Sequence, residues 1–319
     1  MEVELKVPSW ATHLLSDLHG WREKPLPVSE LEPFTLPDDA WFEYAWLDAD
    51  GRPRPDPDGV PAGNPWWDHA CRIAGPRWRE APLVPSPATR SAGRLRGHRL
   101  DSRHLGPGRR HFTYSPAGAA TPGPLILVHD GKGFWHHGRC GPLADALLAA
   151  ERIPPVHLVF LAPERRSAEY AFNAAHAAYV VEEVLPDAMS RMRATGRPRL
   201  LGASLGALAA AHLALGRPGI FGAVGALSGA FLIGPDDDPP DPFAGSEWLL
   251  DRLRAGAGRD LRWHLECGTL EWLLPAHRRL ERALLASGHE HLCRTRNVGH
   301  NWTNWRNALP GVLEFLSEG

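Results

Sequence analysis

Lysine, cysteine and long apolar runs are scarce in this 319-residue chain. Its four cysteines are far apart and form no CxxC pair, so we expect free thiols and a reducing, cytoplasmic location. No run approaches eighteen consecutive apolar residues, which excludes a membrane-spanning helix of ordinary length. The first residues, MEVELK, lack the charged and then apolar pattern of an export signal. We therefore expect a protein without a membrane partner.

The chain also has no large excess of positive or negative charge. The chain has 35 basic and 37 acidic residues, for a formal net charge of −2. A dedicated nucleic-acid binder needs a basic footprint, so we expect no nucleic-acid partner. Hydrophobic residues make up 43% of the chain and charged residues 23%, which is typical of a folded protein with one large domain or two domains.

The first 85 residues are rich in tryptophan and proline and contain seven of the thirteen tryptophans. Short apolar runs broken by turn residues predict an all-β sandwich. Residues 41–47, WFEYAWL, predict a strand, and DADG at 48–51 predicts the turn after it. Residues 81–93 are rich in proline, serine and alanine. We predict a sandwich domain at 1–85, a linker at 86–93 and a catalytic domain at 94–319.

Strands alternate with helices after residue 94. This alternation is typical of βαβ units and predicts a mostly parallel sheet covered by helices on both faces. The expected strands are 125–129, 156–161, 198–203, 223–227, 261–265 and 292–297. The expected helices are 173–193, 205–215, 275–287 and 303–316.

The sequence GASLG at 202–206 matches the G-x-S-x-G pattern of a nucleophile elbow. A predicted strand ends before it and a predicted helix begins after it, which is the context that the motif requires. The tight turn exposes the serine, and small flanking residues let strand and helix approach each other. We therefore predict that Ser204 is a catalytic nucleophile.

A serine hydroxyl needs a base, and the order of residues in this architecture is serine, acid, histidine. His300 lies after the last predicted strand and before the last helix, so it is the expected general base. The acid should follow the strand at 261–265. Glu271 lies in the loop beyond this strand and is the preferred acid, whereas Glu266, on or near the strand, is the competitor. The acid would fix the histidine tautomer.

Acyl transfer also needs hydrogen-bond donors for the oxyanion. The backbone N–H of Leu205, directly after the nucleophile, is one expected donor. The second should come from the loop DGKGFW at 130–135, where we prefer the N–H of Lys132 and keep Gly131 as the alternative.

Several segments together resemble the enterochelin esterase family, within the esterase D, feruloyl esterase and mycolyltransferase group of α/β-hydrolases. They are HDGKGFW (129–135), PERRSAEYAFN (163–173), GASLG (202–206), SGAF (228–231), ECGTLEW (266–272) and GHNWTNWRNAL (299–309). The resemblance covers about residues 90–318. Residues 42–66 are similar to the immunoglobulin-like early-set domain that precedes the hydrolase in this family. The resemblance implies an α/β-hydrolase fold after a small immunoglobulin-like sandwich.

The resemblance also implies a serine carboxylesterase that needs no metal or organic cofactor. Its small-molecule ester substrate is expected to be a catechol siderophore, including its ferric complex. The alternatives are a glycan acetyl or feruloyl esterase and a non-catalytic binding protein. Arg166 is the expected contact to an anionic substrate, unless it pairs with Glu169 and only shapes its loop. Trp135 and Trp302 are expected to face an aromatic substrate, unless they belong to the core.

Overall fold

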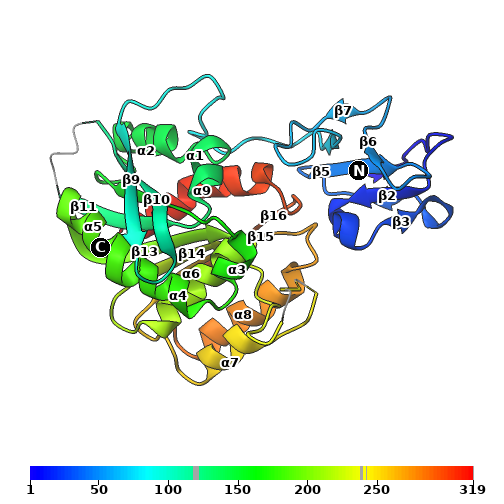
Figure 1. The fold of residues 1–319 in the computed structure, drawn as a ribbon. Helices are drawn as coiled ribbons and strands as arrows, with labels where there is room; N and C mark the ends of the chain where they lie inside the picture. Colours follow the sequence, from blue (N-terminus) through cyan, green and yellow to red (C-terminus); the bar gives the residue numbers. More distant parts are fainter. Residues whose placement is uncertain (118–121, 238–239, 242, 319) are drawn as a thin grey trace. The chain divides into compact units, whose positions relative to one another are not determined.

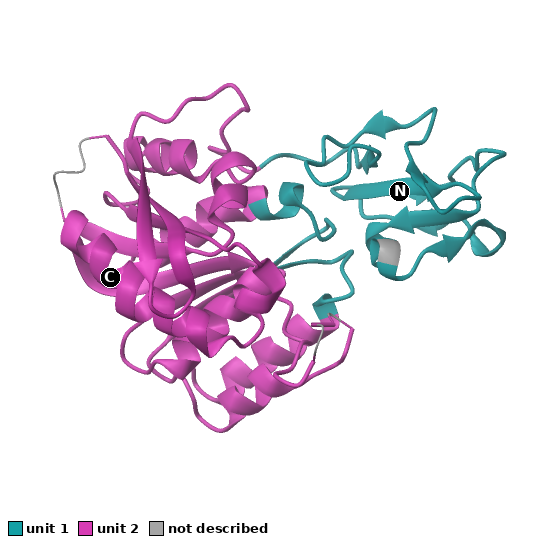
Figure 2. Ribbon diagram, viewed as in Figure 1, with its two compact units in different colours: residues 1–80, 267–274, 295–305 teal, residues 81–266, 275–294, 306–319 magenta. Residues whose placement is uncertain are grey.

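The computed structural model describes residues 1–117, 122–237, 240–241 and 243–318 (Figure 1). The chain forms two compact units, each built from separate stretches of sequence (Figure 2). Unit 1 comprises residues 1–80, 267–274 and 295–305, and unit 2 comprises residues 81–266, 275–294 and 306–319. Two short segments of the predicted catalytic region therefore pack with the first 80 residues.

Unit 1 is built around an antiparallel sheet with an aromatic central strand. The predicted strand at 41–47 is confirmed as β5, Trp41–Leu47, and its residues Phe42 and Trp46 are fully buried. The strands of this sheet in the described residues are ordered β3-β2-β5-β8-β7, with β6 paired to β5. Their bounds are β2 His13–Ser16, β3 Leu26–Pro27, β6 Pro53–Arg54, β7 Val60–Pro61 and β8 Cys71–Ala74. A separate pair joins β1, Glu2–Val3, to β4, Phe34–Thr35. An immunoglobulin-like fold for this unit stays a prediction.

Unit 2 has a mixed sheet, and the described strands are ordered β16-β15-β14-β13-β11-β12-β10-β9. Five neighbouring strands, in the order β12, β11, β13, β14 and β15, run parallel to one another. Strand β10 pairs antiparallel with both β12 and β9. The α/β alternation expected after residue 94 is confirmed, with an antiparallel hairpin added at one edge. The bounds are β9 Arg94–Ser102, β10 Gly106–Ser115, β11 Gly123–Val128, β12 His157–Ala162, β13 Ala194–Ala203, β14 Ala223–Leu227, β15 Arg262–Gly268 and β16 His291–Arg296.

Helices cover both faces of this sheet because side chains alternate between the faces along each strand. Val224 and Ala226 of β14 join the main core with α6, α7 and α8, whereas a Cβ at Gly225 would contact Val312 and Leu316 of α9 on the opposite face. The α-helices are α1 Gly131–His136, α2 Cys140–Ala149, α3 Arg166–Tyr170, α4 Ala174–Tyr179, α5 Leu185–Arg191, α6 Leu205–Gly216, α7 Trp248–Arg254, α8 Leu274–Ala286 and α9 Trp302–Ser317. In the part of the chain that the structure describes, no helix is both long and apolar enough to cross a membrane.

Candidate active site

Ser204 occupies the sharp turn between β13 and α6. Its φ of 53° and ψ of −124° lie outside the regions that non-glycine residues ordinarily adopt. The backbone holds this conformation from both sides, because the Ser204 N–H donates to Leu227 O at 2.9 Å and Ser204 O accepts from Ala230 N at 3.1 Å. Such strain at a strand-to-helix turn is the geometry of a nucleophile elbow.

Glycines two residues before and two residues after Ser204 allow close approach of the neighbouring chain segments. A Cβ on Gly202 would lie 2.2 Å from Gly206 O, and a Cβ on Gly206 would lie 2.7 Å from Asp130 Oδ2. Both contacts are shorter than real Cβ atoms make. The two glycines therefore let α6 turn back against β13, and they bring the Asp130 loop beside the elbow.

Leu205 is the first residue of α6, and its side chain is buried. The first N–H groups of a helix have no acceptor within the helix, and the helix dipole makes this end favourable for negative charge. The Leu205 N–H therefore has the chemical character that an oxyanion donor needs.

The loop after β11 carries the second expected donor. Asp130 has a left-handed φ of 55° and precedes α1, so Lys132 lies in the first turn of this helix. A Cβ on Gly131 would lie 2.5 Å from Phe160 Cβ, so only glycine lets α1 begin so close to β12. The Lys132 side chain is exposed, and its backbone N–H belongs to the helix start.

Arg166 joins the Asp130 loop to the elbow. Its Nε lies 2.7 Å from Asp130 Oδ1 and its Nη2 lies 2.7 Å from Asp130 Oδ2, which makes a bidentate ion pair. The same Nη2 lies 3.4 Å from Ala203 O, directly before Ser204. The alternative pairing of Arg166 with Glu169 is wrong, because Glu169 pairs with the buried Arg109 instead.

Glu271 and His300 lie together in unit 1. His300 Nδ1 is 2.7 Å from Glu271 Oε2, and the Glu271 side chain is fully buried. The other carboxylate oxygen, Oε1, accepts hydrogen bonds from Gly268 N at 2.8 Å and Asn304 Nδ2 at 2.9 Å. The carboxylate is thus fixed from several directions. With Nδ1 donating to it, the imidazole carries its acceptor lone pair on Nε2.

Glu266, the competing acid, has a different neighbour. It lies on β15, and its Oε1 is 3.1 Å from His264 Nε2 in a fully buried setting.

The strands of unit 1 support the loop that carries His300. Trp41 N donates to Asn297 O at 2.8 Å, and a Cβ on Gly299 would lie 1.9 Å from Cγ of Asp17. Asp17 is buried and accepts from Trp21 Nε1 at 3.0 Å and from Glu43 N at 2.8 Å. Burial raises the pKa of Asp17 well above its usual value, and the nearby Glu43 raises it further.

The two candidate tryptophans have different surroundings. Trp302 is 3% exposed and packs against Trp66 and Trp305 in unit 1, as a core residue does. Trp135 is half-buried and lines a cavity of about 120 Å³ together with Lys132 and other residues of α1 and the sheet. Trp135 is therefore better placed than Trp302 to contact a bound molecule.

Three further residues of the site were not identified from the sequence. Asn304 lies in the first turn of α9, whereas His300 precedes this helix, so helical spacing gives no signal for the Asn304 contact with Glu271. Asp130 lies beside the predicted oxyanion residues, but the sequence around it contains no signal that its partner is Arg166. Asp17 is separated from the His300 loop by more than 280 residues, as its contact with Asn301 shows, so no local signal could reveal it.

Comparisons with known proteins agree on the class of fold. Residues 102–316 match the esterase family model described as "Putative esterase". No curated protein matches this chain. The chain is similar to the enterobactin esterase from Shigella flexneri determined in the presence of enterobactin, with a TM-score of 0.71 and 20% identity over 97% of this chain and 88% of that one.

Two further solved structures extend this similarity. The ferric enterobactin esterase from Salmonella typhimurium has a TM-score of 0.71 and 20% identity, over 95% of this chain and 88% of that chain. A ferulic acid esterase has a TM-score of 0.60 and 20% identity, over 72% of this chain and 99% of that chain. At these identities, the similarity establishes the fold.

Proposed function

The chain belongs to the esterase family and is a serine esterase, and we propose that Ser204 is its nucleophile. The observation that carries this proposal is the strained Ser204 turn between β13 and α6, with Gly202 two residues before it, where a Cβ would lie 2.2 Å from the backbone oxygen of Gly206. Strain of this kind costs free energy and persists where the surrounding structure and the function require it. Ser204 would attack the ester carbonyl carbon and form an acyl-enzyme.

His300 and Glu271 are the base and the acid of this proposal. His300 Nε2 would take the proton of the serine hydroxyl and then donate it to the leaving alcohol. Glu271 would hold the ring through Nδ1 and stabilise the imidazolium that forms. His300 would next activate the water molecule that hydrolyses the acyl-enzyme, which restores the free serine.

The oxyanion would be bound by two backbone groups. We assign these roles to the N–H groups of Leu205 and Lys132, with Gly131 as the alternative to Lys132. Both preferred groups lie in the first turn of a helix, where N–H groups have no acceptor within the helix. Loss of one such donor typically lowers turnover about a hundredfold to a thousandfold.

The substrate that we propose is an ester of a catechol siderophore. Support comes from the similarity to enterobactin esterases, which extends over 95–97% of this chain and so includes its N-terminal part. A feruloyl or glycan acetyl ester is the second candidate, because the ferulic acid esterase matches 72% of the chain.

Two assays test the proposal. In the first, Ser204→Ala should abolish hydrolysis of p-nitrophenyl acetate, a loss on the order of a millionfold. Ser190→Ala, at an exposed serine on α5, is the control and should leave hydrolysis unchanged. Residual activity of more than a few per cent in Ser204→Ala would contradict the nucleophile assignment.

The second assay compares enterobactin, ferric enterobactin, feruloyl esters and acetylated sugars at equal concentration. The catecholate trilactones should give the highest kcat/KM. A clear preference for feruloyl or sugar esters would replace the siderophore proposal and leave the catalytic proposal standing.

A further inference from the structure

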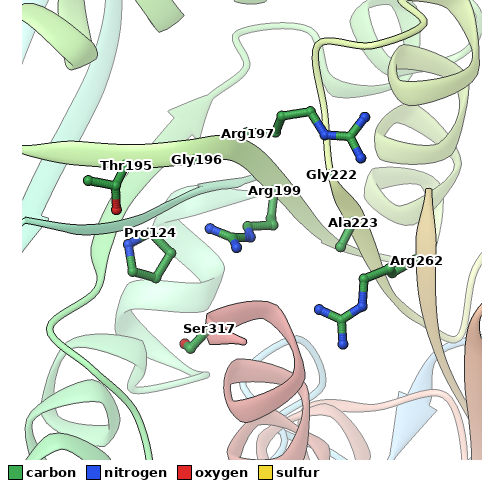
Figure 3. Close-up of a pocket in the computed structure, with 9 residues that line it drawn as sticks. All are labelled: Pro124, Thr195, Gly196, Arg197, Arg199, Gly222, Ala223, Arg262 and Ser317. Atoms are coloured by element: carbon green, nitrogen blue, oxygen red, sulfur yellow. The ribbon is translucent and has the colours of Figure 1, made fainter. Parts of the chain in front are cut away.

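Unit 2 contains a second cavity, of about 260 Å³, lined by three arginines (Figure 3). It lies where the parallel strands begin, since its lining residues include Pro124 of β11, Thr195 of β13 and Ala223 of β14. Ser204 follows the opposite end of β13. Ser204 is five positions after Arg199, a distance of about 16 Å in extended chain, so the cavity is distinct from the candidate active site.

A break in the sheet register opens this cavity. Pro124 pairs with Thr195, but the next pair joins Ile126 to Arg199, so β13 advances four residues while β11 advances two. Gly196, with a φ of 68°, provides the left-handed turn that this bulge needs. Bulges re-aim side chains and are common at functional sites. Figure 3 shows the Arg199 guanidinium inside the cavity, with Arg262 and Ser317 around it.

Arg199 is the unusual residue of this cavity. It is 8% exposed, and among the described residues its guanidinium has a backbone carbonyl and no carboxylate as its hydrogen-bond partner. Its Nη2 donates to Glu318 O at 2.8 Å, which satisfies one carbonyl after α9 and leaves most of its five N–H donors for other partners. Burial lowers the pKa of Arg199, and the charges of Arg262 and Arg197 lower it further. A buried charge is costly unless a counter-charge accompanies it.

The neighbouring acidic groups lie outside the cavity lining. Arg197 pairs with Asp260 at 2.5 Å, and Arg262 pairs with Glu290 at 2.5 Å and Glu318 at 2.7 Å. These carboxylates are about half to two-thirds exposed, and ion pairs at such positions are weak and easily rearranged. These carboxylates therefore occupy the solvent side of Arg197 and Arg262 and leave the cavity itself, within the described part of the chain, lined by arginine without an acidic side chain.

We propose that this cavity binds a small, doubly charged oxyanion, either a phosphate or a dicarboxylate, through Arg199 and Arg262. The guanidinium fork matches the oxygens of both groups. The volume is below the roughly 300–1,000 Å³ of sites for drug-sized ligands, which limits the occupant to a compact anion. This site is independent of the proposed catalytic mechanism.

Isothermal titration calorimetry on the full chain tests the proposal, with inorganic phosphate and succinate at constant ionic strength maintained by sodium chloride. The wild type should bind one anion per chain, and Arg199→Gln should bind at least about tenfold more weakly, the scale of one charge-assisted hydrogen bond. Arg103→Gln, at an exposed arginine paired with Glu182, is the matched control and should bind like the wild type. The tighter of the two anions identifies the chemistry of the site.

The variant Thr195→Glu tests the same site by a second route, in case Arg199→Gln does not fold. Thr195 is an exposed lining residue, so its replacement should preserve folding, which thermal unfolding would verify, while its carboxylate repels the anion. We expect no measurable binding by this variant. Undetectable binding of both anions by the wild type at millimolar concentration, or binding by Thr195→Glu equal to that of the wild type, would overturn the proposal.

Discussion

His300 Nδ1 lies 2.7 Å from Oε2 of Glu271, and the remaining oxygen of this carboxylate is held by Gly268 and Asn304. Glu271→Gln should therefore lower kcat about a thousandfold to ten-thousandfold, because an amide can present its N–H₂ group to Nδ1 and favour the wrong tautomer. Glu266→Gln is the comparison, since Glu266 pairs with His264, and it should have a much smaller effect. Steady-state kinetics with one ester measures both. The opposite ranking would assign the role of acid to Glu266.

Arg166 should act as a positioning residue for the elbow. Its bidentate pair with Asp130 uses the nitrogens that a substrate anion would otherwise bind. Arg166→Ala should then lower kcat/KM for anionic and neutral esters by the same factor, about tenfold or more, and also lower the Tm. Arg166→Lys should restore only part of the loss, because an ammonium cannot form the bidentate pair. A selective rise in KM for the anionic ester would show that Arg166 contacts the substrate.

Gly299 should tolerate no side chain. Gly299→Ala would bring its Cβ to 1.9 Å from Cγ of the buried Asp17, so either the fold is strained or the His300 loop moves. We expect a loss of about 1–3 kcal/mol in the free energy of unfolding together with reduced turnover. Gly216→Ala is the control, because nothing lies within 4 Å of a Cβ there. Denaturant unfolding and an esterase assay of both variants check this, and wild-type behaviour of Gly299→Ala would refute it.

His176 should make stability depend on pH. Burial lowers the pKa of His176 to about 4, and Arg109 lowers it further against the opposing effect of Glu169. The unfolded chain, with a histidine pKa of about 6.5, binds more protons between these values, so stability falls as pH drops from about 6.5 toward 4. The slope from one such group is at most about 1.4 kcal/mol per pH unit.

The variant His176→Gln isolates this contribution. It should flatten the pH dependence of the unfolding free energy in that window, whereas His136→Gln, at an exposed position, should leave it unchanged. An identical slope for His176→Gln and the wild type would contradict the assignment.

The elements predicted best from the sequence are those whose pattern is local. Strands β5 and β14 have the predicted bounds, because each is a short apolar run with turn residues at its ends. The helix expected at 173–193 is found over 174–191, but a π-helical turn, Val180–Val184, interrupts it before Pro186. Proline has no N–H for the helical ladder, and a π turn is one way to accommodate that loss.

Other elements were missed for physical reasons. The hairpin of β9 and β10 is rich in charged residues and has an exposed outer strand, so its first strand resembles a linker in sequence. The short helix α1 contains two glycines, which disfavour helix formation in isolation, and its contact with β12 compensates for them.

Some features of the candidate site are likewise visible in the local sequence, whereas others depend on tertiary contacts. The Ser204 elbow is encoded in five consecutive residues, and the order of Ser204, Glu271 and His300 follows from the fold that the strands predict. The ion pair of Arg166 with Asp130 and the packing of Asp17 against Gly299 join distant parts of the sequence. Contacts of this kind depend on tertiary packing, and the sequence pattern contains no local signal for them.

The most direct test of the central claim is covalent labelling by a fluorophosphonate, followed by peptide mass spectrometry. An activated serine displaces fluoride from such a reagent, whereas other serines react far more slowly. We predict one label per chain on the peptide that contains Ser204, no label in Ser204→Ala, and slower labelling of the wild type while ester substrate is present at saturating concentration. Labelling at another serine, or stoichiometric labelling of Ser204→Ala, would contradict the account.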